Sequence, residues 1–107
     1  MQGVIPENIE DCLSDNTVFM FSKSSCPYCV KAKALLNSKG VKFTAVECDK
    51  NPLNASQRSQ LTQLSNVTTY PNIFIGKKSI GGCDNLHKLE KSGELNKLLD
   101  AAGIAHN

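Results

Sequence analysis

The residues with the clearest chemistry are two cysteines, Cys26 and Cys29, separated only by a proline and a tyrosine. They lie between an apolar run and a stretch with helical periodicity, which places Cys26 at the start of a helix. Free backbone N–H groups and the helix dipole stabilise an anion there, so a thiolate near neutral pH is expected. Pro27 suits the first helical turn, and Lys23 adds a positive charge that favours the thiolate and can meet an anionic substrate. The spacing puts the second sulfur one turn later, close enough to attack a mixed disulfide on the first.

Two other uses of such a pair are half of a structural zinc site and ordinary buried cysteines. A zinc site needs two further ligands at a matching spacing, and the chain has no second Cys-x-x-Cys. The remaining candidate ligands stand singly along the chain: Cys12, Cys48, Cys83, His87 and His106. The pattern therefore favours thiol–disulfide chemistry, and no metal is expected.

A second cluster, residues 68–71 (Thr-Thr-Tyr-Pro), stands directly before a predicted hairpin. If the Tyr70–Pro71 peptide bond is cis, the N–H and C=O of Tyr70 face outward and can pair with an extended substrate backbone. A plain loop proline is the more common arrangement, because only about 5–6% of X–Pro bonds are cis.

A third cluster, residues 81–84 (Gly-Gly-Cys-Asp), opens a helical stretch. Two glycines let the backbone approach a ligand closely, and the amides of Cys83 and Asp84 form an anion site. Asp84 can also receive an α-ammonium group. A glycine-rich turn with Asp84 as helix cap is the more common use of such a sequence.

The elements that position these clusters follow from periodicity and turn residues. Their order is typical of a βαβ unit, with a right-handed crossover, joined to a hairpin. It predicts an α/β fold with a four-stranded mixed sheet and helices on both faces. The predicted helices cover residues 7–14, 26–39 with Gly40 as its stop, 54–64, and a stretch from residue 82 broken at Gly93; the predicted strands cover residues 17–22, 41–48, 73–75 and 79–80.

Length and composition set the class of protein. The 107 residues are 40% hydrophobic and 21% charged, which predicts a single folded domain over residues 1–107 and excludes a disordered chain. Twelve Lys and Arg nearly balance ten Asp and Glu, and aromatic residues are few, so nucleic-acid binding is not expected.

The sequence also gives an expectation about where in the cell the protein is found. The longest apolar burst, residues 18–21, is far shorter than a membrane helix, so no membrane partner is expected. The first seven residues lack the basic and apolar regions of a signal peptide. Five irregularly spaced cysteines are unlike a secreted disulfide framework, which favours the reducing cytoplasm.

With all three clusters in place, the chain resembles the glutaredoxins, specifically the dithiol type. The resemblance spans nearly the whole chain. Thioredoxins share the fold but normally carry Trp-Cys-Gly-Pro-Cys. The matching segments are residues 23–29 (Lys-Ser-Ser-Cys-Pro-Tyr-Cys), 69–71 (Thr-Tyr-Pro), 80–84 (Ile-Gly-Gly-Cys-Asp) and 91–95 (Lys-Ser-Gly-Glu-Leu).

The resemblance implies a thioredoxin fold, a cis Pro71 and glutathione as reductant. We also expect a monomer. The resemblance assigns Cys26 as the nucleophile and Cys29 as the resolving thiol. Arg58 falls where the family places a Gln or Arg near the glycyl carboxylate, which suits a bidentate clamp; a solvated helix charge is the alternative. The implied glutathione groove is lined by Lys23, Tyr28, Arg58, Thr69, Tyr70, Pro71, Cys83 and Asp84.

The chain departs from the family pattern at Tyr70, where most dithiol members have Val. Monothiol members more often have Thr-Tyr-Pro, but their Cys-Gly-Phe-Ser motif and Trp-Pro insertion are absent from this sequence. We therefore expect Tyr70 to tune the groove without changing the class, because the main chain makes the expected contact. Cys83 is interpreted as a small residue beside the groove, although an oxidation-sensitive thiol is the alternative.

The predicted function is a glutathione-dependent thiol–disulfide oxidoreductase. Its substrates would be protein–glutathione mixed disulfides and low-molecular-weight or protein disulfides. One alternative is a thioredoxin-like reductase fed by a reductase protein. Another is an iron–sulfur module, in which two monomers bridge a cluster through Cys26 and two glutathiones. Pro27 argues against the cluster, because the family's cluster binders usually have Gly or Ser there.

Overall fold

The computed structural model describes residues 5–107, so the first four of the seven residues on which the signal-peptide expectation rests lie outside it. The described chain forms one four-stranded sheet with the order β2-β1-β3-β4. The strand β1 (Val18–Ser22) pairs in parallel with β2 (Phe43–Glu47) and antiparallel with β3 (Asn72–Ile75), which pairs antiparallel with β4 (Lys78–Gly81). The predicted mixed sheet is confirmed.

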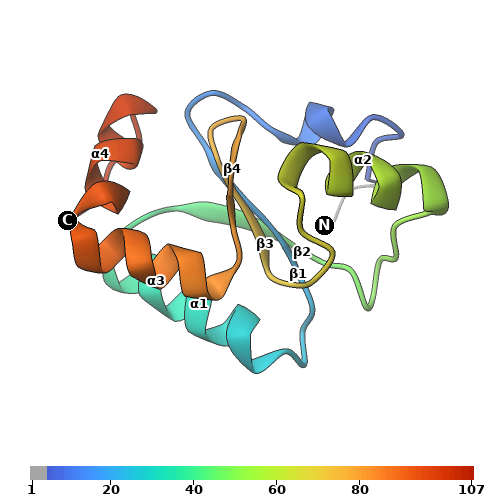
Figure 1. Cartoon of the computed structure of the whole chain (residues 1–107), viewed down its shortest axis with the longest axis horizontal. Coiled ribbons are helices and arrows are strands. Elements are labelled where there is room, and N and C mark those ends of the chain that lie inside the picture. The colour runs from blue at the N-terminus through green and yellow to red at the C-terminus, as the bar shows by residue number, and fades with distance from the viewer. Residues whose placement is uncertain (1–4) are drawn as a thin grey trace.

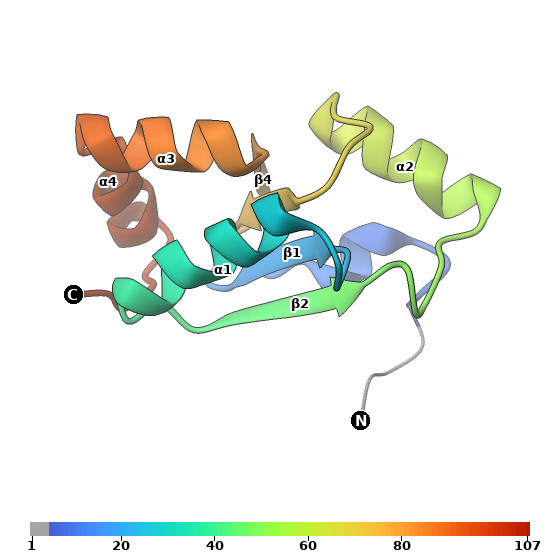
Figure 2. The same ribbon diagram turned by 90° about the horizontal axis from the view of Figure 1, so that it is seen from below.

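Helices cover both faces of the sheet, as Figures 1 and 2 show. One face carries α1 (Pro27–Ser38), α3 (Cys83–Ser92) and α4 (Glu94–Ala101). The other carries α2 (Ala55–Ser65) and a short 3-10 helix (Ile9–Cys12). No helix within residues 5–107 has the length and apolar content needed to cross a membrane.

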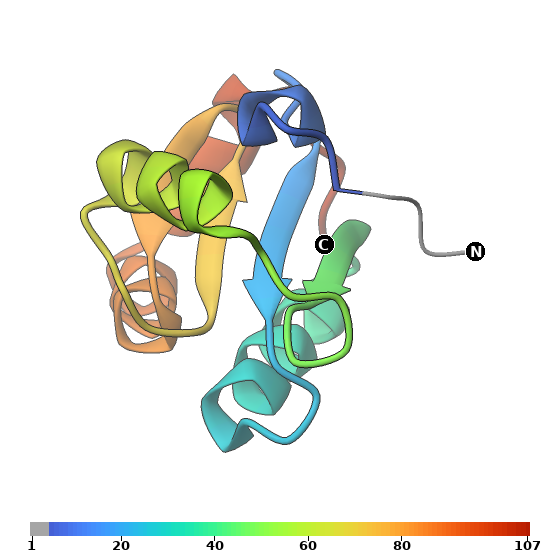
Figure 3. The same cartoon turned by 90° about the vertical axis from the view of Figure 1, so that its right-hand side faces the viewer.

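The strand β1 lies inside the sheet, between β2 and β3, and all five of its residues are buried. Successive side chains of a strand point to opposite faces, so an apolar run can fill two cores at once. Val18 and Met20 pack into the cluster under α1, α3 and α4, and Phe19 and Phe21 into the cluster under α2. This double burial explains why residues 18–21 are apolar without alternation. The chain leaves the carboxyl end of β1 through a loop and then enters α1 (Figure 3).

Helix ends follow the predicted stop and start residues closely. Gly40 adopts φ +69°, and the N–H groups of Gly40 and Val41 bond to the carbonyls of Asn37 and Leu36, as in a Schellman motif. Val41 is therefore used to end α1, and β2 begins at Phe43 instead of residue 41. At the other end of the β2–α2 connection, Asn54 caps α2 in a reciprocal capping box with Gln57.

The helix predicted over residues 7–14 is wrong in its extent and type. The structure has only a 3-10 helix of four residues, Ile9–Cys12. The N–H of Leu13 bonds to the carbonyl of Glu10, three residues back, and Leu13 itself is extended. Ile9 and Leu13 are both buried against the α2 side of the sheet, so a single turn already covers that core.

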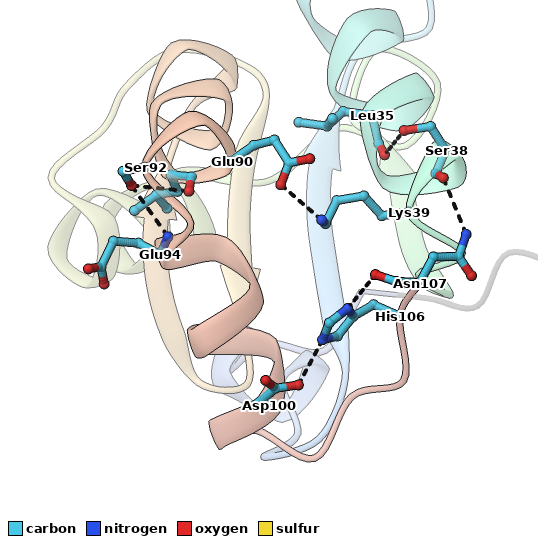
Figure 4. A network of polar contacts seen from close by, with 10 residues as sticks. Leu35, Ser38, Lys39, Glu90, Ser92, Glu94, Asp100, His106 and Asn107 are labelled. Carbon is cyan, nitrogen blue, oxygen red and sulfur yellow. Dashed lines mark hydrogen bonds and ion pairs between the residues drawn. The ribbon is translucent and has the colours of Figure 1, made fainter.

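The end of the chain closes over the C-terminal end of α1 (Figure 4). The backbone N–H of Asn107 donates to the Lys39 carbonyl at 2.6 Å, and Lys39 pairs with Glu90 of α3 at 2.9 Å. His106 Nε2 lies 2.7 Å from a carboxylate oxygen of Asp100. These contacts tie the helix that begins at Cys26 to the C-terminal helices.

Candidate active site

Cys26 occupies the N-cap position of α1, directly after the loop that leaves β1. Its backbone is extended, and its carbonyl accepts the first helical hydrogen bond from Val30 at 3.1 Å. Pro27 is the first helical residue, where its missing N–H leaves no bond unmade. The predicted placement of Cys26 at a helix start is therefore confirmed.

Several groups act on the pKa of the Cys26 thiol. Partial burial opposes ionisation, but hydrogen bonds from the backbone and thiol of Cys29 and from the backbone of Tyr28 favour the thiolate, as does the charge of Lys23. Their combined effect lowers the pKa below that of a free cysteine. Cys26 is also partly exposed, so its sulfur is both ionisable and reachable.

Cys29 has the opposite character. Its side chain is fully buried, and its sulfur accepts a hydrogen bond from the backbone N–H of Lys23 at 3.4 Å. Burial raises its pKa, and the neighbouring Cys26 raises it further. The structure therefore places a protonated thiol directly behind a more acidic one, which is the arrangement that the Cys-x-x-Cys spacing predicted.

The second predicted cluster lies close to Cys26, because β1 and β3 are neighbours in the sheet. The Tyr70–Pro71 peptide bond is cis, as the family resemblance implied, so the more common plain loop proline is not what the chain adopts. The Cys26 sulfur lies 3.8 Å from the carbonyl oxygen of Tyr70. A segment that is remote in sequence thus brings backbone polar groups to the thiol.

The third cluster lies against the second. Gly81 has φ +85°, and a side chain at Gly82 would place its Cβ only 3.3 Å from the Pro71 carbonyl oxygen. Gly81 thus adopts a backbone conformation that favours glycine, and a side chain at Gly82 would crowd the Pro71 carbonyl. Gly82 is the N-cap of α3 and Asp84 lies exposed in its first turn, so the alternative interpretation of Asp84 as helix cap is wrong.

Two hollows adjoin the Thr69–Tyr70 segment, which lines both. The larger, about 1150 Å³, includes Tyr28, Pro71, Cys83 and Asp84 in its walls. The smaller, about 400 Å³, includes Arg58. Lys23 reaches over the Tyr70 ring, with its Nζ 4.9 Å from the ring centroid. The residues singled out from the sequence thus lie around two hollows that share the Thr69–Tyr70 segment, and the Cys26 sulfur lies 3.8 Å from the Tyr70 carbonyl oxygen.

Arg58 is less free than its predicted role suggests. Its guanidinium donates a hydrogen bond to the carbonyl of Leu53 at 2.8 Å, which holds the side chain beside its own helix. Arg58 and Tyr70 still line the same smaller hollow. Arg58 is exposed, so both the glutathione role and the solvated helix charge stay open as interpretations.

Sequence reasoning missed two residues that follow β2. Cys48 is buried, and Tyr70 packs against the core cluster that contains it. Asp49 accepts hydrogen bonds from the backbone N–H (3.1 Å) and the hydroxyl of Ser24, and these bonds lower the pKa of its carboxyl group. The signal was available, because β1 and β2 are parallel and their carboxyl ends meet at one edge of the sheet.

Apart from the active-site cysteine pair, two other candidate metal ligands lie close together. Cys83 Sγ and His87 Nδ1 lie 3.4 Å apart. Among residues 5–107, no three His, Cys, Asp or Glu side chains are placed to hold a metal ion together.

Comparison with known proteins identifies the family. The family model described as Glutaredoxin matches residues 18–80. A glutaredoxin of Pseudomonas aeruginosa is 44% identical over 84 residues, covering 78% of this chain and 96% of the relative. Glutaredoxin-C2 of Arabidopsis thaliana is 41% identical, covering 91% of this chain and 87% of the relative.

Solved structures agree with the sequence relatives. A buckwheat glutaredoxin–glutathione complex superposes with a TM-score of 0.80 at 32% identity, covering 88% of this chain and 86% of that one. The dithiolic glutaredoxin 2-C-Grx1 of Trypanosoma brucei brucei superposes with a TM-score of 0.77 at 37% identity, covering 91% and 99%. The expected thioredoxin-like fold is confirmed. The chain therefore belongs to the glutaredoxin family and is a glutathione-dependent thiol–disulfide oxidoreductase.

Proposed function

We propose that the chain is a dithiol glutaredoxin in which Cys26 is the nucleophile and protein–glutathione mixed disulfides are the main substrates. The Cys26 thiolate attacks the glutathionyl sulfur of the mixed disulfide. A Cys26–glutathione disulfide forms, the bond to the protein sulfur breaks, and the protein leaves as a thiolate that takes up a proton. The observation that carries this proposal is a thiol of lowered pKa at a helix N-terminus, 3.8 Å from the carbonyl before a cis proline.

Two routes would complete the cycle. The thiolate of a second glutathione attacks the glutathionyl sulfur on Cys26, which releases oxidised glutathione and restores the Cys26 thiolate. Alternatively, Cys29 loses its proton and attacks the Cys26 sulfur, which releases reduced glutathione and leaves a Cys26–Cys29 disulfide. Reduction of protein disulfides also ends in that intramolecular disulfide, and two glutathiones then reduce it.

Glutathione would bind along the surface between Lys23 and Asp84. The N–H and C=O of Tyr70 would pair with its cysteinyl backbone, and Lys23 and Arg58 would face its glycyl carboxylate. The N-terminus of α3 at Cys83 and the carboxylate of Asp84 would take its γ-glutamyl end, with Tyr28, Thr69 and Pro71 as walls. Likeness to the buckwheat glutaredoxin–glutathione complex supports this proposal.

We also propose that the protein acts as a monomeric single domain in the cytoplasm. The cysteines outside the active-site pair, Cys12, Cys48 and Cys83, are all free thiols, which suits a reducing compartment.

A glutathione-coupled assay tests this function. The substrate is a glutathionylated peptide, and turnover is followed as NADPH consumption by glutathione reductase in the presence of glutathione. We expect turnover with this system and none when thioredoxin reductase replaces glutathione and its reductase. The reverse result would make the chain a thioredoxin-like reductase and would overturn the proposal.

A further inference from the structure

The side chain of Tyr70 makes contacts that its backbone role does not require. On one face of its ring lies the ammonium of Lys23, 4.9 Å from the ring centroid. A cation this close to an aromatic face is attracted by the ring quadrupole. Lys23 is otherwise an exposed side chain on the loop before α1.

The other end of Tyr70 is anchored in the core. Its ring packs against the buried core cluster that contains Cys48, whose own thiol points to the Val46 carbonyl at 3.8 Å. The Cys48 backbone is fixed in turn, because its N–H donates to the Ser22 carbonyl at 2.7 Å. Burial, together with Cys48, raises the pKa of Tyr70 to about 12, so the hydroxyl stays protonated at neutral pH.

The link to the reaction runs through Lys23. Its positive charge is one of the groups that lower the pKa of Cys26. A lysine side chain has four rotatable carbon–carbon bonds, so an unrestrained ammonium spreads its charge over many positions. An ammonium held over the ring of Tyr70, whose carbonyl oxygen lies 3.8 Å from the Cys26 sulfur, keeps its charge in the neighbourhood of that thiol.

We propose that Tyr70 is a positioning residue, whose ring packs against the core cluster that contains Cys48 and holds the Lys23 ammonium beside the Cys26 thiolate. The proposal rests on the proposed role of Cys26 as nucleophile. It separates the two parts of Tyr70: the backbone carbonyl contacts the Cys26 sulfur, whereas the ring contacts Lys23. Valine, which most dithiol members carry at this position, has no ring and cannot hold Lys23 in this way.

A double-mutant cycle on the free protein tests this directly. The pKa of Cys26 is obtained from the pH dependence of its alkylation by iodoacetamide, with peptide mapping to separate it from the other thiols. The cycle combines Lys23→Gln with Tyr70→Val, a substitution that the family tolerates, and Tyr70→Phe keeps the ring as the conservative control.

We expect Lys23→Gln to raise the pKa of Cys26 in the wild-type background and to raise it less in the Tyr70→Val background. The difference in the acid dissociation constant should be at most about two- to fivefold, the size of a cation–π contact at an exposed site. Tyr70→Phe should restore most of the Lys23 effect.

An equal effect of Lys23→Gln in both backgrounds would overturn the proposal, as would no effect of Lys23→Gln in the wild type. The measurement uses no glutathione, so its failure is distinct from failure of the proposed function. That function is judged by turnover in the coupled assay.

Discussion

Two identical side chains, Cys26 and Cys29, acquire opposite chemistry from their positions within one helical turn. Cys26 stands at the N-cap, where N–H groups from the first turn face its sulfur, and its pKa is lowered. Cys29 is fully buried, and burial raises its pKa. The helix therefore decides which thiol attacks, because only the thiolate is a nucleophile.

The pH dependence of Cys26 follows from the direction of its shift. Its thiolate is present above its lowered pKa, and its reactivity falls only as the pH drops through that value. Titration of the thiolate by its ultraviolet absorbance, in wild type against Cys26→Ser, should give a midpoint below the value of about 8.5 for a free cysteine. A midpoint above that value would contradict the electrostatic account of the N-cap.

The division of labour between the cysteines gives a second prediction. Cys29→Ser should retain turnover on a glutathionylated peptide, because a second glutathione can resolve the intermediate. It should lose most turnover on a disulfide-bonded protein substrate, because that route needs the second sulfur. Both activities are measured with the same coupled assay, and Cys12→Ser is the matched control outside the pair. Equal loss on both substrates would contradict the assigned roles.

The elements that position the site are far apart in the sequence. The helix that begins at Cys26 could be predicted from its motif, periodicity and Gly40 stop, and the sheet class from the order of elements. The contact between Cys26 and Tyr70 could not be derived from local pattern, because it depends on how β1 and β3 lie side by side. The packing of Tyr70 against the cluster that contains Cys48 was missed for the same reason, since burial of a single cysteine leaves no periodic signal.

Two helices on opposite faces of the sheet carry the expected glutathione contacts. Arg58 comes from α2 and Asp84 from the first turn of α3. Arg58→Ala and Asp84→Ala should each raise the KM for glutathione more than they lower kcat, because both act on binding and neither on sulfur transfer. Steady-state kinetics with varied glutathione measures this, with Lys88→Ala, exposed on α3, as control. An unchanged KM in both variants would show that the groove lies elsewhere.

At the scale of the whole molecule, two cores on either side of β1 join the site to the rest of the chain. Contacts at the C-terminal end of α1 hold α3 and the last residue of the chain against it, because Lys39 pairs with Glu90 and the Asn107 N–H bonds to the Lys39 carbonyl. The contact between His106 and Asp100 makes the stability of this C-terminal packing sensitive to pH.

The sign of that sensitivity can be stated. Hydrogen bonds to the Asn107 backbone and the Asp100 carboxylate raise the pKa of His106 in the folded protein. Its stabilising contribution is therefore full below the ordinary histidine pKa of about 6.5 and is lost as the pH rises through the raised value. His106→Gln should lower the Tm more at about pH 5.5 than at about pH 8.5.

The control for this prediction is Lys97→Gln, which removes an exposed pair with Glu94 at 3.8 Å. It should lower the Tm little at either pH, since exposed pairs contribute little to stability. A Tm loss in His106→Gln that is the same at both pH values would contradict the assignment.

The most direct test of the central claim is to trap the covalent intermediate. Cys29→Ser is mixed with a glutathionylated peptide without free glutathione, and the product is analysed by intact mass and peptide mapping. We expect one glutathionyl group per chain, attached to Cys26, and release of the peptide thiol in equal amount. Glutathione attached to Cys12, Cys48 or Cys83 instead, or no transfer at all, would contradict Cys26 as the nucleophile.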